Sequence, residues 1–204
     1  MPLENPLSKK LLMNPKTGTM LTIYLPFKRI PNRTWIFLVG LLYLSIEHAS
    51  AQTPEKRLAD MGIELRTPPA PMANYLRAVR TGNLVYLSGH GPSKSDGTLV
   101  LGKVGQELTL EQGQQAARLT GIALLTSLKA EIGELSKVKR VVKVLGMVNA
   151  GPEFTQHPLV INGFSDLMVA VLGDKGKHAR SAIGVASLPS NMAVEIEMIV
   201  EIED

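Results

Sequence analysis

Residues 178–203 read HARSAIGVASLPSNMAVEIEMIVEIE and contain two strand-like runs separated by a turn. The first run, residues 181–187, is rich in small and β-branched side chains, and the Leu-Pro-Ser-Asn sequence at 188–191 has turn chemistry. In the second run, residues 193–203, apolar side chains at the even positions alternate with glutamates at most odd positions. The pattern predicts a C-terminal β-hairpin with one apolar face and one acidic face.

Arg180 stands where the chain enters the first of these strands. A guanidinium can hold a carboxylate with two parallel hydrogen bonds, which makes Arg180 a candidate ligand for an acid. In a hairpin, a residue that enters one strand lies near residues that leave the turn on its partner, so Glu195 is expected beside Arg180. The alternative is a surface arginine in an ion pair, because most arginines are exposed.

The chain upstream of this stretch alternates between strand and helix patterns. Thr109 and Gln112 have capping-box spacing, and the apolar residues that follow keep helical spacing to Gly133. The other predicted elements are a short helix at 53–63, strands at 74–80, 84–88 and 138–148, and a helix at 154–172. The order β-β-α-β-α-β-β indicates an α+β fold in which two helices cover one face of a single sheet. The glutamate-rich composition of the other face predicts no large exposed apolar patch.

The first 51 residues have the pattern of a leader. Basic residues at 28, 29 and 33 precede an uncharged apolar run at 35–46, and Ala49-Ser50-Ala51 follows as a small-residue cleavage motif. We therefore expect 1–51 to be a signal peptide, 52–70 an N-terminal extension and 71–204 the folded domain. Cleavage after Ala51 would export the protein without a stable membrane anchor. The alternatives are an uncleaved anchor or a mis-assigned start, with Met20 giving a more ordinary leader. Without cleavage the protein would be cytoplasmic or membrane-anchored.

Charge and composition exclude several classes of function. Residues 52–204 contain 16 basic and 16 acidic side chains, so the part beyond the leader lacks the basic footprint of a nucleic-acid binder. The chain has no cysteine and therefore no thiol nucleophile or disulfide. His90, His157 and His178 lack the spacing of a metal site, and each is expected to be structural or exposed. We expect neither a metal nor another cofactor.

Three short motifs in the C-terminal stretch resemble the signature of the RidA/YjgF family, formerly called L-PSP endoribonucleases. They are Arg180-Ser181, Leu188-Pro189 and Glu195-Ile196-Glu197, and the resemblance extends from about residue 71 to residue 203. Members of this family hydrolyse reactive enamines and imines. The resemblance implies a chorismate-mutase-like fold and a homotrimer with pockets between subunits.

The resemblance also implies roles for individual residues. Arg180 would hold the substrate carboxylate, and Glu195 would position or activate water. The alternative for Glu195 is one more member of a solvated glutamate row. The substrate-binding positions implied by the resemblance are Tyr75, for which a packed tyrosine is the alternative, Ser88, Gly89, Asn162 and Ser181.

The chain departs from the family pattern at positions 182 and 184. Where the family has a cysteine and a glutamate, this chain has Ala182 and Gly184, and we expect a roomier, less polar pocket. The resemblance implies an imine deaminase that needs no cofactor and takes a small carboxylate substrate. The alternative is a trimer that binds small carboxylates without catalysis, and RNA cleavage is a third reading that the charge does not favour.

Overall fold

The computed structural model describes residues 9–13, 20–24, 52–70 and 73–203, and it divides the chain into two units, Met1–Ala51 and Gln52–Asp204. In the first unit, β1 (Lys9–Met13) pairs antiparallel with β2 (Met20–Tyr24). The apolar run and the cleavage motif of the predicted leader lie outside the described residues. Among the described helices, none has the length and apolar character needed to cross a membrane.

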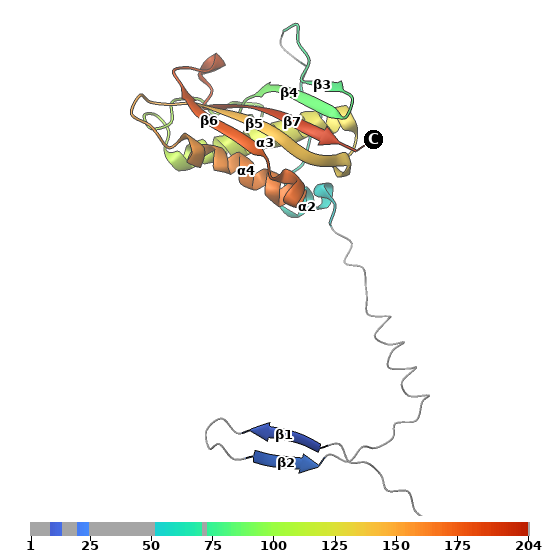
Figure 1. The fold of residues 1–204 in the computed structure, drawn as a ribbon. Coiled ribbons are helices and arrows are strands. Elements are labelled where there is room, and N and C mark those ends of the chain that lie inside the picture. Colours follow the sequence, from blue (N-terminus) through green and yellow to red (C-terminus); the bar gives the residue numbers. More distant parts are fainter. Residues whose placement is uncertain (1–8, 14–19, 25–51, 71–72, 204) are drawn as a thin grey trace, which may run out of the picture. The chain divides into compact units, whose positions relative to one another are not determined.

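The second unit is built on one five-stranded sheet with the order β3-β4-β7-β5-β6 (Figure 1). All neighbouring strands are antiparallel except β5 and β6, which are parallel. A parallel pair needs a crossover connection, and α4 supplies it between these two strands. The strands are β3 (Ala78–Thr81), β4 (Leu84–His90), β5 (Val138–Asn149), β6 (Ala179–Val185) and β7 (Val194–Ile202).

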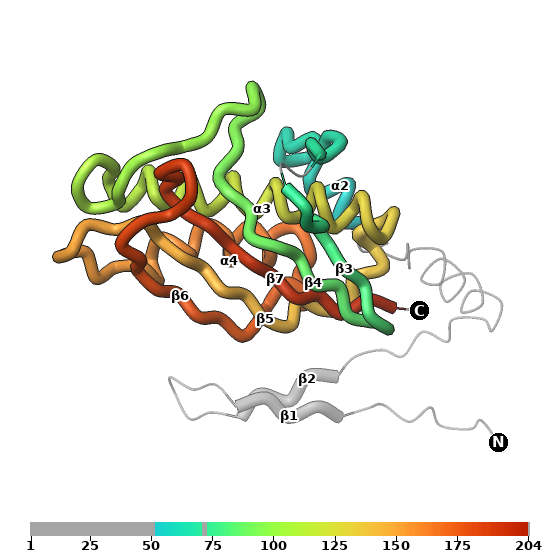
Figure 2. The backbone as a smooth tube through the Cα atoms, turned by 90° about the horizontal axis from the view of Figure 1, so that it is seen from above, coloured from blue at the N-terminus to red at the C-terminus, as the bar shows by residue number. Residues whose placement is uncertain are grey.

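The predicted C-terminal hairpin is wrong, because β6 and β7 lie on opposite sides of β5. Figure 2 shows β6 at one edge of the sheet, with β5 between it and β7. The chain between them turns at Pro189–Asn191, where Ser190 and Asn191 adopt positive φ angles of 53° and 57°. β7 has the longer apolar face. Because this strand pairs with β4 on one side and β5 on the other, its apolar side chains lie in the middle of the sheet and are fully buried. The small-residue strand β6 is left at the edge.

Both long helices cover the same face of the sheet, as predicted (Figure 1). The α3 helix (Leu110–Ile132) begins with the expected capping box between Thr109 and Gln112. The α4 helix (His157–Leu172) begins three residues later than predicted. Thr53 caps the short helix α2 (Pro54–Asp60) by accepting a hydrogen bond from the Lys56 amide. The even-numbered side chains of β7 from Val194 to Ile202 are buried against the helices, so its predicted alternation is confirmed.

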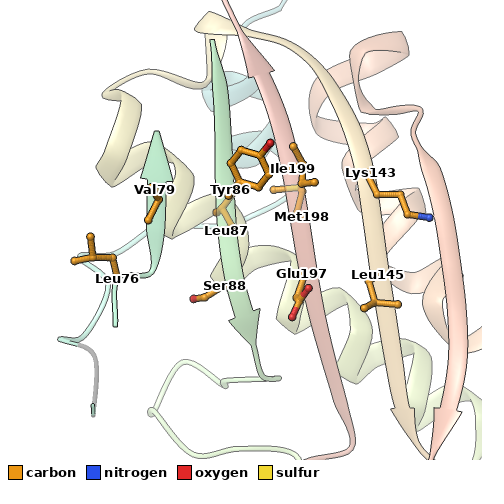
Figure 3. Close-up of a pocket in the computed structure, with 10 residues that line it drawn as sticks. All are labelled: Leu76, Val79, Tyr86, Leu87, Ser88, Lys143, Leu145, Glu197, Met198 and Ile199. Carbon is orange, nitrogen blue, oxygen red and sulfur yellow. The ribbon is translucent and has the colours of Figure 1, made fainter. Parts of the chain in front are cut away.

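The face of the sheet opposite the helices is less polar than its glutamates led us to expect. Leu76, Val79 and Tyr86 expose 67%, 49% and 43% of their surface around a hollow of about 350 Å³ (Figure 3). Lys143 and Glu197 supply charge at its margin. The predicted absence of an apolar patch rested on the glutamates of β7. Most of the exposed apolar side chains come instead from β3, β4 and the loop before them.

His90, at the end of β4, is a buried histidine that makes stability depend on pH. Its Nδ1–H donates to the Ser88 carbonyl at 2.7 Å, and its Nε2 lies 2.7 Å from the Ser127 hydroxyl. Burial lowers the pKa of His90 below its ordinary value of 6.5, the carbonyl bond opposes this, and the charge of Arg77 lowers the pKa further. The folded state therefore binds fewer protons than the unfolded state below that value.

We expect the free energy of unfolding to have its full value above pH 6.5. It should decrease as the pH drops from 6.5 toward the pKa of His90 in the folded state. Urea titrations at pH steps from about 7.5 to 5 would measure the slope. In His90→Gln the slope should shrink, because the titrating group is gone. An unchanged slope in this variant would show that His90 does not titrate differently in the two states.

Candidate active site

Arg180 lies at the seam between the edge strand β6 and helix α4, with its side chain half-buried. Its Nη1 donates to Asn162 Oδ1 at 2.9 Å and to Ser165 Oγ at 3.0 Å, and its Nη2 donates to the Pro158 carbonyl at 3.3 Å. All three acceptors are neutral. Within residues 52–70 and 73–203, no carboxylate lies within ion-pair distance of this guanidinium. The surface ion pair considered as an alternative is therefore absent from this part of the chain.

The guanidinium of Arg180 keeps two N–H groups for a ligand. Arginine has five N–H donors, and three are used by the contacts to α4. The two that have no partner in the described residues are one on Nε and one on Nη2, two nitrogens that lie side by side in the planar group. Such an edge is the fork that binds a carboxylate with two parallel hydrogen bonds.

His178 fixes this arrangement through Ser165. Its Nδ1 lies 2.7 Å from the Gly176 carbonyl, which can only accept, so Nδ1 carries the proton. Nε2 then accepts from the Ser165 hydroxyl at 3.1 Å, and the Ser165 oxygen is left to accept from Arg180. Burial lowers the pKa of His178, the bond to Gly176 opposes this, and the positive charge of Arg180 lowers it further. We call Arg180, Asn162, Ser165 and His178 the Arg180 cluster.

Ser165 was not predicted as a site residue, and His178 was expected to be structural or exposed. Asn162 and Ser165 are three residues apart, so they share one face of α4 and can both reach the same side chain. That spacing was the available signal. Asn162 was predicted as a site residue, and the structure brings it into direct contact with Arg180.

Ser181 faces away from the Arg180 cluster. Its hydroxyl accepts a hydrogen bond from Lys143 Nζ at 2.8 Å, and Lys143 lies on the open face of the sheet (Figure 3). Successive side chains of a strand point to opposite faces, so Ser181 and Arg180 cannot share one face. In the Arg-Ser pair, Arg180 therefore lies on the helix-covered face of the sheet and Ser181 on the open face.

A second cluster forms where β4 ends beside the start of β7. The Glu195 carboxylate packs against Gly89, where an added Cβ would overlap Oε1 and lie 2.8 Å from Cδ. The pairing of β4 with β7 shifts register between Leu87 and His90, which leaves room for this approach. Ser88, next to Gly89, donates its hydroxyl to the Arg77 carbonyl at 3.3 Å. We call Ser88, Gly89 and Glu195 the Glu195 cluster.

Tyr75 stands apart from both clusters in the described contacts. It precedes β3, exposes 46% of its surface, and bonds through its backbone amide to the Ala73 carbonyl. The packed tyrosine considered as an alternative is not what the structure has.

The two clusters lie on opposite faces of the sheet within one chain. Arg180 contacts α4, so it belongs to the helix-covered face. Glu195 alternates with the buried Val194 and Ile196, so it belongs to the open face. The prediction that Arg180 and Glu195 are neighbours is therefore wrong within a single chain, and β5 lies between their strands.

The expected extra room at position 184 is also absent. An added Cβ on Gly184 would overlap Nε2 of His157 and lie 2.7 Å from its Cε1. The imidazole thus occupies the space that a side chain at this position would take.

In the described residues no group of three or more metal-ligating side chains comes together.

Glu195 holds its proton more tightly than an ordinary glutamate. Partial burial raises the pKa of Glu195, and the negative charge of Glu197 on the same face raises it further. Glu197→Gln should therefore lower the pKa of Glu195, which carboxyl NMR titration would measure. Glu201→Gln is the matched control, because Glu201 lies on the same face but pairs with Lys139 at 2.6 Å. An unchanged Glu195 titration in Glu197→Gln would exclude the charge effect.

Comparisons with known proteins place the chain in a family. Residues 55–202 match the family model described as "YjgF/chorismate_mutase-like, putative endoribonuclease". Protein TCP17 of Trypanosoma cruzi is 40% identical over 148 residues, which cover 72% of this chain and 92% of that protein. A 2-iminobutanoate/2-iminopropanoate deaminase of Dermatophagoides farinae is 34% identical over 137 residues, 66% of this chain and 91% of the relative.

The solved structures agree with the sequence comparisons. The protein Atu1372 of Agrobacterium tumefaciens, whose function is described as unknown, is 44% identical with a TM-score of 0.69. The similarity covers 74% of this chain and 94% of that structure. With its α+β sheet and two covering helices, the chain belongs to the YjgF/chorismate mutase-like family.

Proposed function

We propose that this protein hydrolyses 2-imino acids, or the enamines in equilibrium with them, to 2-oxo acids and ammonia. The observation that carries the proposal is Arg180, whose guanidinium is held by neutral acceptors and keeps a two-donor edge for a carboxylate. The similarity to the Dermatophagoides farinae deaminase supports this reaction class. The balanced charge of residues 52–204 gives no support to RNA cleavage.

The reaction asks mainly for positioning. Arg180 holds the substrate carboxylate, so the imine carbon stays open to water. Water adds to that carbon and forms a carbinolamine. The water proton passes to a base and then to the nitrogen, after which ammonia leaves as the carbonyl forms. Glu195 is suited to position this water, because its carboxylate can accept a hydrogen bond from it.

A site that contains both Arg180 and Glu195 requires more than one chain, because the two lie on opposite faces of the sheet. In a cyclic homotrimer, the Arg180 cluster of one subunit can meet the Glu195 cluster of the next, which gives three equivalent sites. The apolar hollow around Leu76, Val79 and Tyr86 supports an interface on the open face. We therefore propose a homotrimer with its sites between subunits.

The test is to generate 2-iminopropanoate or 2-iminobutanoate with an amino-acid oxidase and to follow its decay. The protein should accelerate the decay in proportion to its concentration. No acceleration by folded protein would contradict the proposed function. Binding of 2-oxobutanoate without turnover would then identify a carboxylate-binding protein that lacks catalysis.

A further inference from the structure

We propose that His157 is a second catalytic residue on the Arg180 side of the site, where it carries the proton between water and the leaving nitrogen. This inference rests on the proposed imine hydrolysis. His157 begins helix α4, and its side chain is half-buried.

The first argument is the position of the ring. The Nε2, Cε1 and Cδ2 atoms of His157 all lie where a side chain on Gly184 would be, with the carbons 2.7 and 2.8 Å from an ideal Cβ. The ring edge that carries Nε2 therefore rests directly on the β6 backbone. Only glycine allows this approach, because any Cβ would displace the imidazole.

The second argument is that this ring edge faces the same seam as the guanidinium. Arg180, Ala182 and Gly184 alternate along β6 and so share the face that contacts α4. Arg180 and Gly184 are about 13 Å apart along the strand. The arginine side chain spans part of that distance, because its Nη2 reaches the carbonyl of Pro158, which is the residue next to His157. A small acid bound to the guanidinium would extend over Ala182 toward the imidazole. Ala182 has only a methyl group on this face.

The third argument is that the ring is held in place but keeps Nδ1 for a ligand, because it is the Nε2 edge that rests on Gly184. Phe154 contacts it edge to face, with ring centroids 5.5 Å apart and an interplanar angle of 77°. Within residues 52–70 and 73–203, neither ring nitrogen of His157 makes a hydrogen bond. By contrast, both nitrogens of His90 and of His178 are bonded. His157 is thus placed by packing against Gly184 and Phe154, and its Nδ1 has no partner in this part of the chain.

The proposed step balances protons. Neutral imidazole accepts a proton from the water as its oxygen bonds to the iminium carbon and the C=N π electrons move to nitrogen. The imidazolium then returns that proton to the amino nitrogen, and the C–N bond breaks. The hydroxyl proton leaves with ammonia as ammonium, so iminium and water give a 2-oxo acid and ammonium with no other reactant. In this scheme Glu195 of the neighbouring subunit positions the water.

The test compares His157→Ala and His157→Gln with wild-type protein in the imine-decay assay. We expect kcat to fall about 100-fold in both, the scale of general acid–base catalysis, with KM changed less than about threefold because Arg180 still holds the carboxylate. Added imidazole should restore the rate of His157→Ala, and a series of substituted imidazoles should restore it according to their basicity. A merely structural histidine would give no such rescue.

Gly184→Ala gives an independent check. Its Cβ should displace the imidazole and lower kcat in the wild-type background, but it should have no further effect in His157→Ala. Gln156→Ala is the matched control, because Gln156 is exposed, precedes His157 and makes no side-chain capping bond. It should keep full activity.

The outcomes separate the two proposals. If wild-type protein accelerates imine decay and both His157 variants keep that rate, the role of His157 is contradicted and the proposed function stands. Loss of kcat in folded variants without imidazole rescue, and with additive Gly184→Ala effects, also contradicts the role. If wild-type protein does not accelerate the decay, the proposed function and this inference fail together.

Discussion

Replacing Arg180 with alanine should reduce kcat/KM for 2-imino acids by roughly 100-fold or more. Hydrogen bonds to charged groups contribute about 1.5–3 kcal/mol each, and the variant loses two of them with the substrate carboxylate. The fold should persist, because the side chain is half-exposed on an edge strand and its three acceptors can bond to water instead. Steady-state kinetics with in-situ imine, together with a urea titration, measures both effects.

Two further variants test whether the loss of activity is specific to the guanidinium of Arg180. Arg180→Lys keeps the charge but not the planar fork, so it should recover only part of the activity. Arg80→Ala removes an exposed arginine whose side chain, within the described residues, bonds only to the Gly82 carbonyl of its own turn, and it should have wild-type activity. A folded Arg180→Ala protein with unchanged kcat/KM would remove Arg180 from the site.

Gly163→Ala should strongly destabilise the packing of α4 against α3. An added Cβ on Gly163 of α4 would overlap the Gln114 carbonyl oxygen of α3 and lie 2.8 Å from its carbonyl carbon. Backbone cannot rotate out of the way, so the helices must separate. We expect a loss of about 2 kcal/mol, because a clash with backbone puts the overpacking cost at the upper end of its usual range, about 3 kcal/mol, and the gain in helix propensity offsets about 1 kcal/mol of it. Activity should fall too, because α4 carries Asn162 and Ser165.

The control for this variant is the same substitution at Gly113 in α3. There an added Cβ would meet only methyl groups of Val104 and Val160, at 3.1 to 3.3 Å. Those side chains can shift, so the change in unfolding free energy should stay within about 1 kcal/mol. Equal urea midpoints for Gly163→Ala and wild type would show that the α3–α4 contact is looser than the structure has it.

The sequence predicted those parts of the fold that are specified locally. The capping box at Thr109 and the alternation of β7 are both confirmed, because each depends on residues within a few positions of one another. Strand order depends on long-range pairing instead. Nothing in the Leu188–Asn191 turn reveals that the chain crosses β5 before it re-enters the sheet, and the hairpin prediction failed for that reason.

The candidate site divides in the same way. Arg180 and Asn162 were predicted from the family resemblance, and the structure joins them at 2.9 Å. The roles of Ser165 and His178 depend on how α4 packs against β6, which no short motif encodes. The contact between His157 and Gly184 joins residues that are 27 positions apart on different elements, so an isolated histidine and an isolated glycine gave no sign of it.

The most direct test of the account is whether two inactive chains can complement each other. Arg180→Ala and Glu195→Gln should each be inactive alone. Co-expressed with different tags and purified as mixed oligomers, they should regain about a third of wild-type activity, because every cyclic trimer that contains both chains has one of its three sites with both residues intact. Mixed oligomers that contain both chains but stay as inactive as either parent would contradict a site built between subunits from Arg180 and Glu195.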